Sequence, residues 1–312
     1  MGRFLTKLII YAGITLVIFT IADFFLSRKL RHSNILEFQA WNNIYNQKLR
    51  NDVVIMGSSR AFVHFNPRIM DSILHVSSYN LGYNASLVNR QVERYYSYCR
   101  IQETEPRAII YSIDYGTVAG ITTDFEREQF YPYFFSDRDL MEAFDKYQKF
   151  SFMEKYIPFW RYCPCFFDFH VYDVLTNPEE KDPLYKGFKN NRTTWDDFLL
   201  QEKDSIDYTC SKEAKQIFED YIHDMHSKGK KIIFVYSPLY LEFANKFRGI
   251  DRMYEYYDSI SQKYDIPILD YSNDPICSDT SYFYNAAHLN KIGADIFSLQ
   301  VSKDIDSLKL LK

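Results

Sequence analysis

The sequence predicts a protein of the α/β class, a parallel sheet between two layers of helices, with an N-terminal transmembrane helix and an aromatic-rich insertion. Three features of the 312 residues predict it: an apolar run near the amino terminus, short apolar runs alternating with helical stretches, and a long aromatic stretch without strand periodicity. The formal net charge of −4 and the charged fraction of 25% exclude a disordered chain and offer no basic face for nucleic acid.

The amino-terminal apolar run covers residues 8–26 and contains one charge, Asp23, near its far end. A helix of these 19 residues spans about 28 Å, close to the hydrocarbon thickness of a bilayer. A cleaved signal peptide is the alternative, but the run is long for one and continues into residues 27–31 without a small-residue cleavage site. We therefore expect an uncleaved membrane anchor over residues 1–30.

The charges that flank this run leave its orientation nearly balanced. Arg3 and Lys7 lie on one side, and Arg28, Lys29 and Arg31 lie on the other. If the short N-terminal tail stays in the cytoplasm, the rest of the chain lies outside it. We expect a single-pass protein of the cell membrane with an extracytoplasmic soluble domain, because every later apolar run is short and interrupted.

The soluble part alternates strand-like and helical segments. Five apolar runs lack strict alternation, which is typical of strands buried on both faces of a parallel sheet: residues 53–56, 78–81, 108–113, 231–236 and 266–269. Four stretches between them predict helices: residues 87–100, 211–229, 251–264 and 290–303. With a short connecting helix expected over residues 34–50, the division is an anchor over 1–30, a connecting segment over 31–50 and an α/β domain over 51–312.

Residues 117–200 interrupt this alternation and contain no clear strand. They are rich in aromatic residues, above all in the run YIPFWRYCPCFFDF over residues 156–169. An insertion between the third and fourth strands could form a lid or substrate groove, because open α/β sheets bind ligands at the carboxyl ends of their strands. The alternative is a satellite hydrophobic cluster, since aromatic side chains readily serve as core.

A Gly57-Ser58-Ser59 turn follows the first apolar run and is the strongest chemical signal in the chain. Such a turn places a hydroxyl at the carboxyl end of the sheet, where backbone N–H groups at a helix N-terminus can stabilise a developing oxyanion. A serine in that position needs a base, because its free hydroxyl is a weak nucleophile. The alternative is an ordinary turn and helix cap.

His288 is the candidate base. It lies in the short connection between the last strand and the last helix, and we therefore expect it at the same end of the sheet as Ser59. The other six histidines lack such a setting: His32, His64, His75, His170, His223 and His226. Arg60 follows the candidate nucleophile and could steer an anionic substrate, although a solvent-facing role is the slightly stronger interpretation.

These residues resemble the SGNH/GDSL hydrolase superfamily. The resemblance rests on the Gly57-Ser58-Ser59 turn after a strand, on Asn80-Leu81-Gly82, and on a late Asn285-x-x-His288-Leu289-Asn290 followed by Gly293-Ala294. It covers Asp52 to about Ser302 outside the insertion, and it is strongest toward membrane-anchored members of the bacterial cell envelope. The resemblance implies a flavodoxin-like αβα sandwich with five parallel strands.

The resemblance also implies roles for individual residues. Ser59 matches the nucleophile, His288 the base, and Gly82 a glycine whose N–H joins that of Ser59 in the oxyanion hole. Two departures stand out. Asn285 occupies the position of the usual acid, and an amide cannot stabilise an imidazolium by charge; Asp270, Asp274 or Asp279 could take that role instead. Asp114 stands where an asparagine donor is usual, and an ionised carboxylate only accepts hydrogen bonds.

The implied function is a membrane-anchored serine esterase or O-acyltransferase that acts on a cell-envelope glycan through an acyl-serine intermediate. The expected partners are an acylated or acyl-accepting envelope polysaccharide, membrane lipid around the N-terminal helix, and a membrane protein that donates acyl groups. The missing acid leaves open a second interpretation, a binding or scaffold protein with little or no activity. No cofactor or metal is expected, since the sequence contains no phosphate-binding glycine motif and no cluster of metal ligands.

Overall fold

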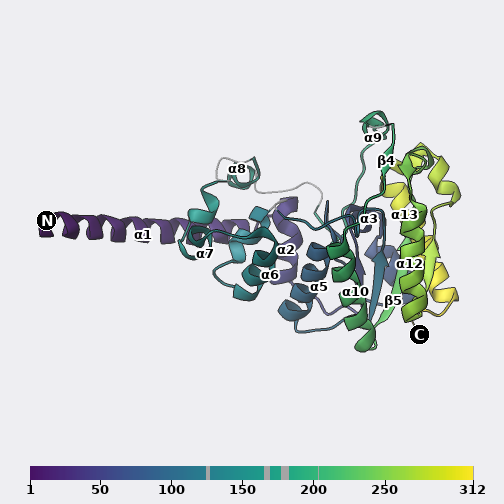
Figure 1. The fold of residues 1–312 in the computed structure, drawn as a ribbon, viewed down its shortest axis with the longest axis horizontal. Coiled ribbons are helices and arrows are strands. Elements are labelled where there is room, and N and C mark those ends of the chain that lie inside the picture. The colour runs from purple at the N-terminus through teal and green to yellow at the C-terminus, as the bar shows by residue number, and fades with distance from the viewer. Residues whose placement is uncertain (124–126, 165–168, 177–182, 203, 312) are drawn as a thin grey trace. The chain divides into compact units, whose positions relative to one another are not determined.

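The computed structural model describes residues 1–123, 127–164, 169–176, 183–202 and 204–311 (Figure 1). The chain forms two compact units. Unit 1 comprises Met1–Gln47 and Thr123–Pro183, and unit 2 comprises Lys48–Thr122 and Leu184–Lys312. Most of the predicted insertion thus belongs to the same unit as the N-terminal helices, whereas its two ends belong to unit 2. The division at residues 30 and 50 that the sequence suggests remains a prediction.

Unit 2 is built on a parallel sheet of five strands, which confirms the predicted fold class (Figure 1). The strand order is β2-β1-β3-β5-β7, and every neighbouring pair is parallel. Because β1 has β2 on one side and β3 on the other, the order of the sheet reverses at β1, and such a switch point opens a crevice at the carboxyl ends of the strands. The strands are β1 Val53–Met56, β2 Ser78–Asn80, β3 Ala108–Ser112, β5 Lys231–Tyr236 and β7 Ile268–Asp270.

Helices form two groups around this sheet. In one group, α13 packs against α3 and α4; in the other, α10 packs against α5 and α12. Side-chain caps start two of these helices: Ser211 accepts the N–H of Ala214 at α10, and Asn290 accepts two N–H groups at α13. The helices are α3 Ser59–His64, α4 Pro67–Leu74, α5 Val88–Gln102, α10 Lys212–Ser227, α12 Asp251–Tyr264 and α13 Lys291–Ser307. The sequence pattern predicts α5, α10, α12 and α13, and the Gly57-Ser58-Ser59 turn predicts a helix that starts where α3 does, whereas α4 is not predicted.

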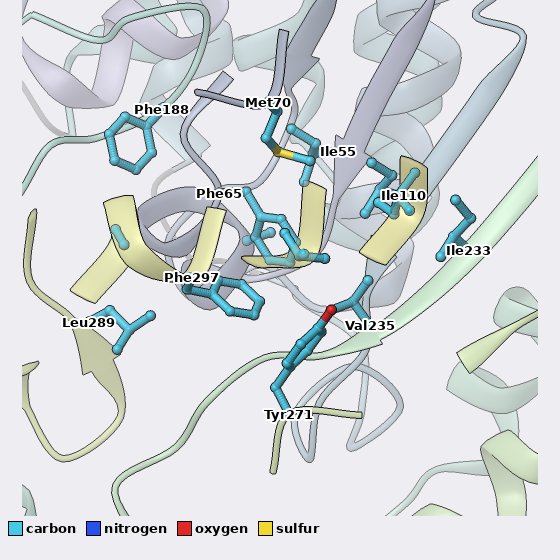
Figure 2. Packing of buried hydrophobic residues seen from close by; sticks show 14 of the residues in the cluster. Ile55, Phe65, Met70, Ile110, Phe188, Ile233, Val235, Tyr271, Leu289 and Phe297 are labelled. Atoms are coloured by element: carbon cyan, nitrogen blue, oxygen red, sulfur yellow. The ribbon is translucent and has the colours of Figure 1, made fainter. Parts of the chain in front are cut away.

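The two faces of the sheet have different cores. Ile55, Ile110 and Ile233 belong to a mainly aliphatic core that also contains Phe65 and Phe297 (Figure 2). On the neighbouring strand positions, the rings of Tyr111 and Phe234 contact aromatic side chains of α10 and α12: Phe218, Tyr221 and Tyr257. The many tyrosines of the sequence therefore build one core layer of unit 2, where their rings remove large apolar areas from water.

Short elements complete unit 2 near the carboxyl ends of the strands. An antiparallel hairpin of β8 and β9 carries residues 283–289, and it precedes the cap of α13. A second small sheet pairs β4 with β6 in parallel. These elements are β4 Ile206–Asp207, β6 Phe247–Arg248, β8 Phe283–Asn285, β9 His288–Leu289, α9 Phe198–Glu202, α11 Leu241–Ala244, η3 Pro275–Ser278 and η4 Thr280–Tyr282.

Unit 1 has an aromatic core. Trp41 of α2 packs edge-on against Phe130 and Phe144, with ring centroids 5.2 and 5.9 Å away, and those two rings stack on each other at 4.0 Å. Aromatic residues of the insertion thus form a core of their own, together with the helix that the sequence predicts as a connection. The elements are α1 Gly2–Leu30, α2 Leu36–Asn46, η1 Arg127–Tyr133, α6 Arg138–Gln148, α7 Phe152–Tyr156, η2 Trp160–Tyr162 and α8 Phe169–Thr176.

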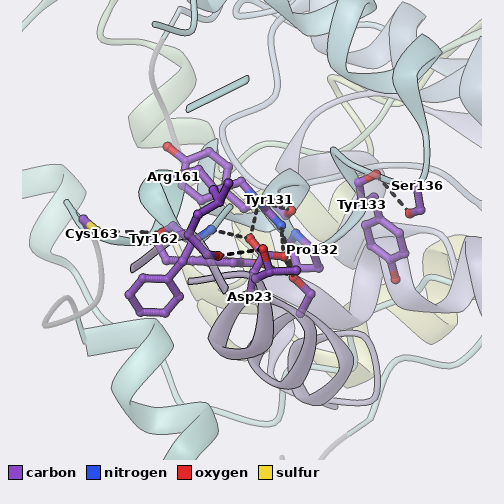
Figure 3. A network of polar contacts seen from close by, with 12 residues as sticks. Asp23, Tyr131, Pro132, Tyr133, Ser136, Arg161, Tyr162 and Cys163 are labelled. Atoms are coloured by element: carbon purple, nitrogen blue, oxygen red, sulfur yellow. Dashed lines mark hydrogen bonds and ion pairs between the residues drawn. The ribbon is translucent and has the colours of Figure 1, made fainter. Parts of the chain in front are cut away.

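Helix α1 is long and apolar enough to cross a membrane. Its first 21 residues are nearly all exposed, whereas Asp23, Leu26, Ser27 and Leu30 are buried in unit 1. Figure 3 shows the polar contacts at this buried end, where Arg161 pairs with Asp23 and their side chains are only 1% and 9% exposed. Ser27 contributes a hydrogen bond of 2.8 Å between its Oγ and the Tyr162 hydroxyl. The last two turns of α1 are therefore part of the core of unit 1.

Candidate active site

The junction of β1 and α3 positions Ser59. Gly57 has a φ of +144°, and a Cβ there would lie 2.7 Å from the Ser112 carbonyl oxygen, so only glycine fits. Ser58 caps α3 with extended backbone, and its Oγ donates to Asp114 Oδ2 at 2.5 Å. Ser59 is then the first residue of α3, half-buried at the carboxyl end of β1. The sequence predicts this position, and the structure places the hydroxyl there.

The β8–β9 hairpin positions His288. The imidazole stacks on the ring of Tyr284, with centroids 5.3 Å apart and an interplanar angle of 6°. The next residue, Leu289, is fully buried and donates its backbone N–H to His64 Nε2 at 3.0 Å. The stacking contact fixes the plane of the imidazole, and the hydrogen bond fixes the position of the strand that carries it.

Ser59, His288 and Asn285 form one chain of hydrogen bonds. The Ser59 Oγ lies 2.7 Å from His288 Nε2, and His288 Nδ1 lies 2.9 Å from Asn285 Oδ1. The backbone N–H of Ala287 donates to the same Asn285 Oδ1 at 3.1 Å. Because that oxygen is an acceptor, the proton of the neutral imidazole must be on Nδ1, and the lone pair of Nε2 faces the serine. The asparagine thus selects the tautomer that a base for Ser59 requires.

The electrostatics of this chain favour a neutral histidine. Burial, followed by the nearby positive charge of Arg60, lowers the pKa of His288 to about 3. The imidazole is therefore unprotonated at neutral pH and free to accept a proton. It is also a weak base, because Asn285 carries no charge that would stabilise the imidazolium.

The aspartates that the sequence offers as alternatives to Asn285 have other partners. Each accepts a backbone N–H from its own loop: Asp270 from Ser272, Asp274 from Ile276, and Asp279 from Ser281. Asp114, in the place of the expected asparagine donor, accepts from Ser58 and from the N–H groups of Gly116 and Thr117. Among the described residues, no three His, Cys, Asp or Glu side chains come together as a metal ion would require.

Gly82 lies where β2 meets α3, and its position requires glycine. A Cβ at Gly82 would lie 2.6 Å from the Phe62 nitrogen and 2.7 Å from the Ala61 Cβ. The N–H of Gly82 donates to Asn80 Oδ1 at 2.8 Å, while the Asn80 amide donates to the Ala61 and Phe65 carbonyls. The Asn80-Leu81-Gly82 segment thus holds α3 against β2. The oxyanion role of Gly82 remains a prediction, and its N–H must leave Asn80 or be shared to perform it.

His64 is a residue of the site that the sequence analysis missed. It is fully buried, and its Nε2 accepts the Leu289 N–H, so the proton of the neutral ring is on Nδ1, 3.0 Å from the Ser237 Oγ. Burial holds the pKa of His64 well below its usual value of 6.5. His64 therefore connects α3, β9 and the end of β5 as a neutral residue. A lone histidine after Ala61-Phe62-Val63 in a short apolar helix is the one local signal for it.

Arg60 differs from the expected solvent-facing residue. The residue is only 6% exposed, and its Nη2 donates to the Ser237 carbonyl and, at 3.2 Å, to the Pro238 carbonyl. It lines a cavity of about 390 Å³ together with Tyr236, at the carboxyl end of β5, and Asp270, at the carboxyl end of β7. The non-local carbonyls that hold the guanidinium cannot be read from the sequence around Arg60.

Comparison with known proteins finds likeness at the level of structure. No family model and no curated protein matches the chain. A lipase/acylhydrolase from Enterococcus faecalis is 11% identical, with a TM-score of 0.42 over 83% of this chain and 96% of its own. An acetyl xylan esterase from Butyrivibrio proteoclasticus is 10% identical, with a TM-score of 0.35 over 83% of this chain and 64% of its own. A structure described as a lipolytic protein of the G-D-S-L family, from Desulfitobacterium hafniense, is 12% identical, with a TM-score of 0.40 over 80% of this chain and 97% of its own.

Proposed function

We propose that this chain is a membrane-anchored serine esterase or O-acyltransferase of the SGNH type that forms an acyl intermediate on Ser59. The observation that carries the proposal is the hydrogen-bonded chain from Ser59 Oγ through His288 to Asn285 Oδ1. A serine hydroxyl whose proton faces the lone pair of an oriented imidazole is the usual arrangement for nucleophilic acyl transfer.

The geometry suits a two-stage reaction. His288 Nε2 takes the Ser59 proton as Oγ attacks the acyl carbonyl carbon, and the carbonyl oxygen becomes an oxyanion. When the ester bond breaks, the imidazolium returns that proton to the leaving alcohol and the acyl group remains on Ser59. A water molecule or a second hydroxyl then attacks the acyl carbon, again with His288 as base, and Ser59 is released. Water gives hydrolysis, and a hydroxyl of an acceptor gives transfer.

A cell-envelope glycan as substrate is the finer part of the proposal. It is supported by the apolar length of α1 and by the resemblance of the sequence motifs to envelope members of the SGNH superfamily. With α1 in a bilayer and unit 2 outside the cytoplasm, polysaccharide hydroxyls and their acyl esters are the substrates within reach. A membrane protein that delivers acyl groups would be the partner of a transferase.

A scaffold or binding protein without activity is the second candidate. Two observations favour it: Asn285 replaces the charged acid, and the Gly82 N–H donates to Asn80. Both lower the expected rate, the first by leaving the imidazolium unstabilised and the second by occupying an oxyanion donor.

Labelling with a fluorophosphonate probe tests the enzyme proposal. The full chain in detergent is the right sample, because the end of α1 belongs to the core of unit 1. We expect a covalent adduct at Ser59, located by mass spectrometry, that disappears in Ser59→Ala and in His288→Ala. Ser58→Ala is the matched control and should still be labelled at Ser59. A folded protein that carries no adduct would contradict the enzyme proposal and favour the scaffold.

A further inference from the structure

The cavity beside α3 contains an incompletely paired cation. Arg60 Nη2 donates to two backbone carbonyls, whereas its buried Nε has no hydrogen-bond partner and its Nη1 makes no hydrogen bond to any described residue. No ion pair with a described carboxylate neutralises this guanidinium. Arginine stays charged under all ordinary conditions, and a buried charge is normally paired. The guanidinium therefore retains N–H donors and a positive charge for a further group.

A second unpaired donor belongs to Tyr236, which also lines the cavity. The Tyr236 hydroxyl is buried and has no hydrogen-bond partner among the described residues. Burial and the negative charges of Asp258 and Asp270 raise the pKa of Tyr236, so the phenol keeps its proton and can donate it. Buried polar groups of folded proteins are nearly always satisfied, by protein, water or ligand. Arg60 and Tyr236, the two residues with these unsatisfied groups, both line the cavity, and we therefore consider it as a place for an external acceptor.

The residues of the cavity wall indicate which kind of molecule carries this acceptor group. Aromatic rings supply apolar faces: Tyr236 lies against Tyr254 with centroids 4.9 Å apart, and Tyr115 lies against Phe247 with centroids 4.4 Å apart. Asn245 and Asn273 add amide groups. Among the described residues of the wall Asp270 is the one carboxylate; it is exposed and accepts the N–H of Ser272. Ring faces, amides and a buried cation in about 390 Å³ suit one sugar unit with a negative charge.

We propose that this cavity is a subsite for an anionic sugar, in which Arg60 and Tyr236 bind a carboxylate or phosphate group of the substrate. The proposal rests on the proposed function for its meaning as a substrate site, since Arg60 directly follows Ser59 in α3. Neither Ser59 nor His288 lines the cavity, so the ester that reacts would lie on the part of the substrate outside it. The negative charge of the bound group would also affect the proposed base. Arg60 lowers the pKa of His288, and a bound anion would raise that pKa again by offsetting the charge of Arg60.

Calorimetric binding to the full chain in detergent tests the subsite separately from catalysis. The titrants are glucuronate, glucose 6-phosphate and uncharged glucose, and the protein is Ser59→Ala, in which no acyl transfer to Ser59 can occur. We expect at least one charged sugar to bind about tenfold or more tightly than glucose, the size of one charge-assisted hydrogen-bonded contact. Comparison of the two charged sugars shows whether the group bound is a carboxylate or a phosphate.

Two further substitutions in this background assign the contacts. Arg60→Gln should remove the preference for the charged sugar. Tyr236→Phe keeps the ring and should weaken binding of the charged sugar about threefold to tenfold. Tyr236→Phe should also fold normally, because its hydroxyl has no partner to lose. Equal binding of charged and uncharged sugars, no binding of any of the three, or an unchanged preference in a folded Arg60→Gln protein would overturn the subsite. Failure of probe labelling at Ser59 with intact sugar binding would overturn only the enzyme proposal.

Discussion

Each unit of this chain contains a polar network, buried in unit 1 and half-buried in unit 2, and the two networks differ in charge. In unit 1, Arg161 is held by the carboxylate of Asp23, with both side chains at most 9% exposed. In unit 2, the histidine of the Ser59–His288 pair is held by Asn285, whose amide is neutral. In unit 1 the carboxylate of Asp23 thus pairs with a permanent cation. In unit 2 the amide of Asn285 occupies the position of the acid in a catalytic triad.

The difference separates two uses of a polar contact. A buried ion pair makes the loss of either partner costly, because the other charge is left without compensation. A neutral amide fixes the direction and tautomer of the imidazole without raising its pKa. In unit 1 an ion pair therefore attaches helix α1 to the core. In unit 2 a neutral amide orients the imidazole of the proposed base.

Removal of the carboxylate from unit 1 should give the largest effect on stability. Asp23→Ala removes the carboxylate that pairs with the buried Arg161 guanidinium. We expect a loss of about 3–5 kcal/mol in the free energy of unfolding. Chemical denaturation of the full chain in detergent measures it. The matched control is Glu142→Ala, which breaks the exposed Arg138–Glu142 pair of α6 and should cost less than about 1 kcal/mol. Equal effects of the two substitutions would show that the buried pair contributes no more than a surface pair.

Introduction of a carboxylate into unit 2 should increase activity. Asn285→Asp keeps an acceptor for His288 Nδ1 and for the Ala287 N–H and adds the missing charge, which raises the pKa of His288. We expect the rate of labelling by the fluorophosphonate probe to rise about tenfold to a hundredfold at pH 7, equivalent to one or two pKa units. Asn285→Ala, which removes the acceptor as well, should slow the reaction. An unchanged rate in Asn285→Asp would mean that charge at this position does not limit the chemistry.

The pH dependence of activity follows from the same histidine. Because the pKa of His288 is about 3, the base is unprotonated throughout the neutral range. As the pH is lowered from 8 to 5, the labelling rate of the wild-type chain should therefore show no loss attributable to His288. The raised pKa of His288 in Asn285→Asp means that the labelling rate of this variant should begin to fall at a higher pH than that of the wild type. A wild-type profile with a midpoint near the ordinary histidine pKa of about 6.5 would contradict this.

A smaller effect concerns stability and His64. Its pKa is lowered in the folded chain, so its contribution is fully present above the unfolded value of 6.5 and is lost as the pH falls below it. Each such histidine should remove about 1.4 kcal/mol of stability per pH unit below that point. Thermal unfolding at pH 7.0 and 5.5 measures the difference, and His64→Gln should reduce it by the share of one histidine. A stability independent of pH over this range would show that His64 accepts a proton without cost.

The sequence predicts the sheet of unit 2 well because the signal for it is local. Most of its strands are continuous apolar runs such as Val53–Met56, and turn residues and helix caps separate the strands. The same logic places Ser59 and His288 at one end of the sheet, since carboxyl ends of parallel strands share an edge. The structure brings these two side chains within hydrogen-bond distance.

What the sequence does not reveal depends on partners far along the chain. Arg60 is held by carbonyls of residues 237 and 238, and His64 by Ser237 and the Leu289 N–H. No local pattern encodes such backbone acceptors and donors. The packing of the unit 1 core is not predicted for a related reason, since its rings come from separate parts of the chain: Trp41 from α2, Phe130 from η1 and Phe144 from α6.

The buried end of α1 has a mechanical consequence. A helix whose last two turns belong to a domain core cannot act as a loose tether. If lipid surrounds the exposed part of α1, unit 1 is held at a set height above the bilayer and cannot swing freely about its point of attachment. Any tilt of the span then tilts unit 1 as a whole. Because the tilt of a spanning helix depends on the thickness of the bilayer, membrane thickness would determine the orientation of unit 1.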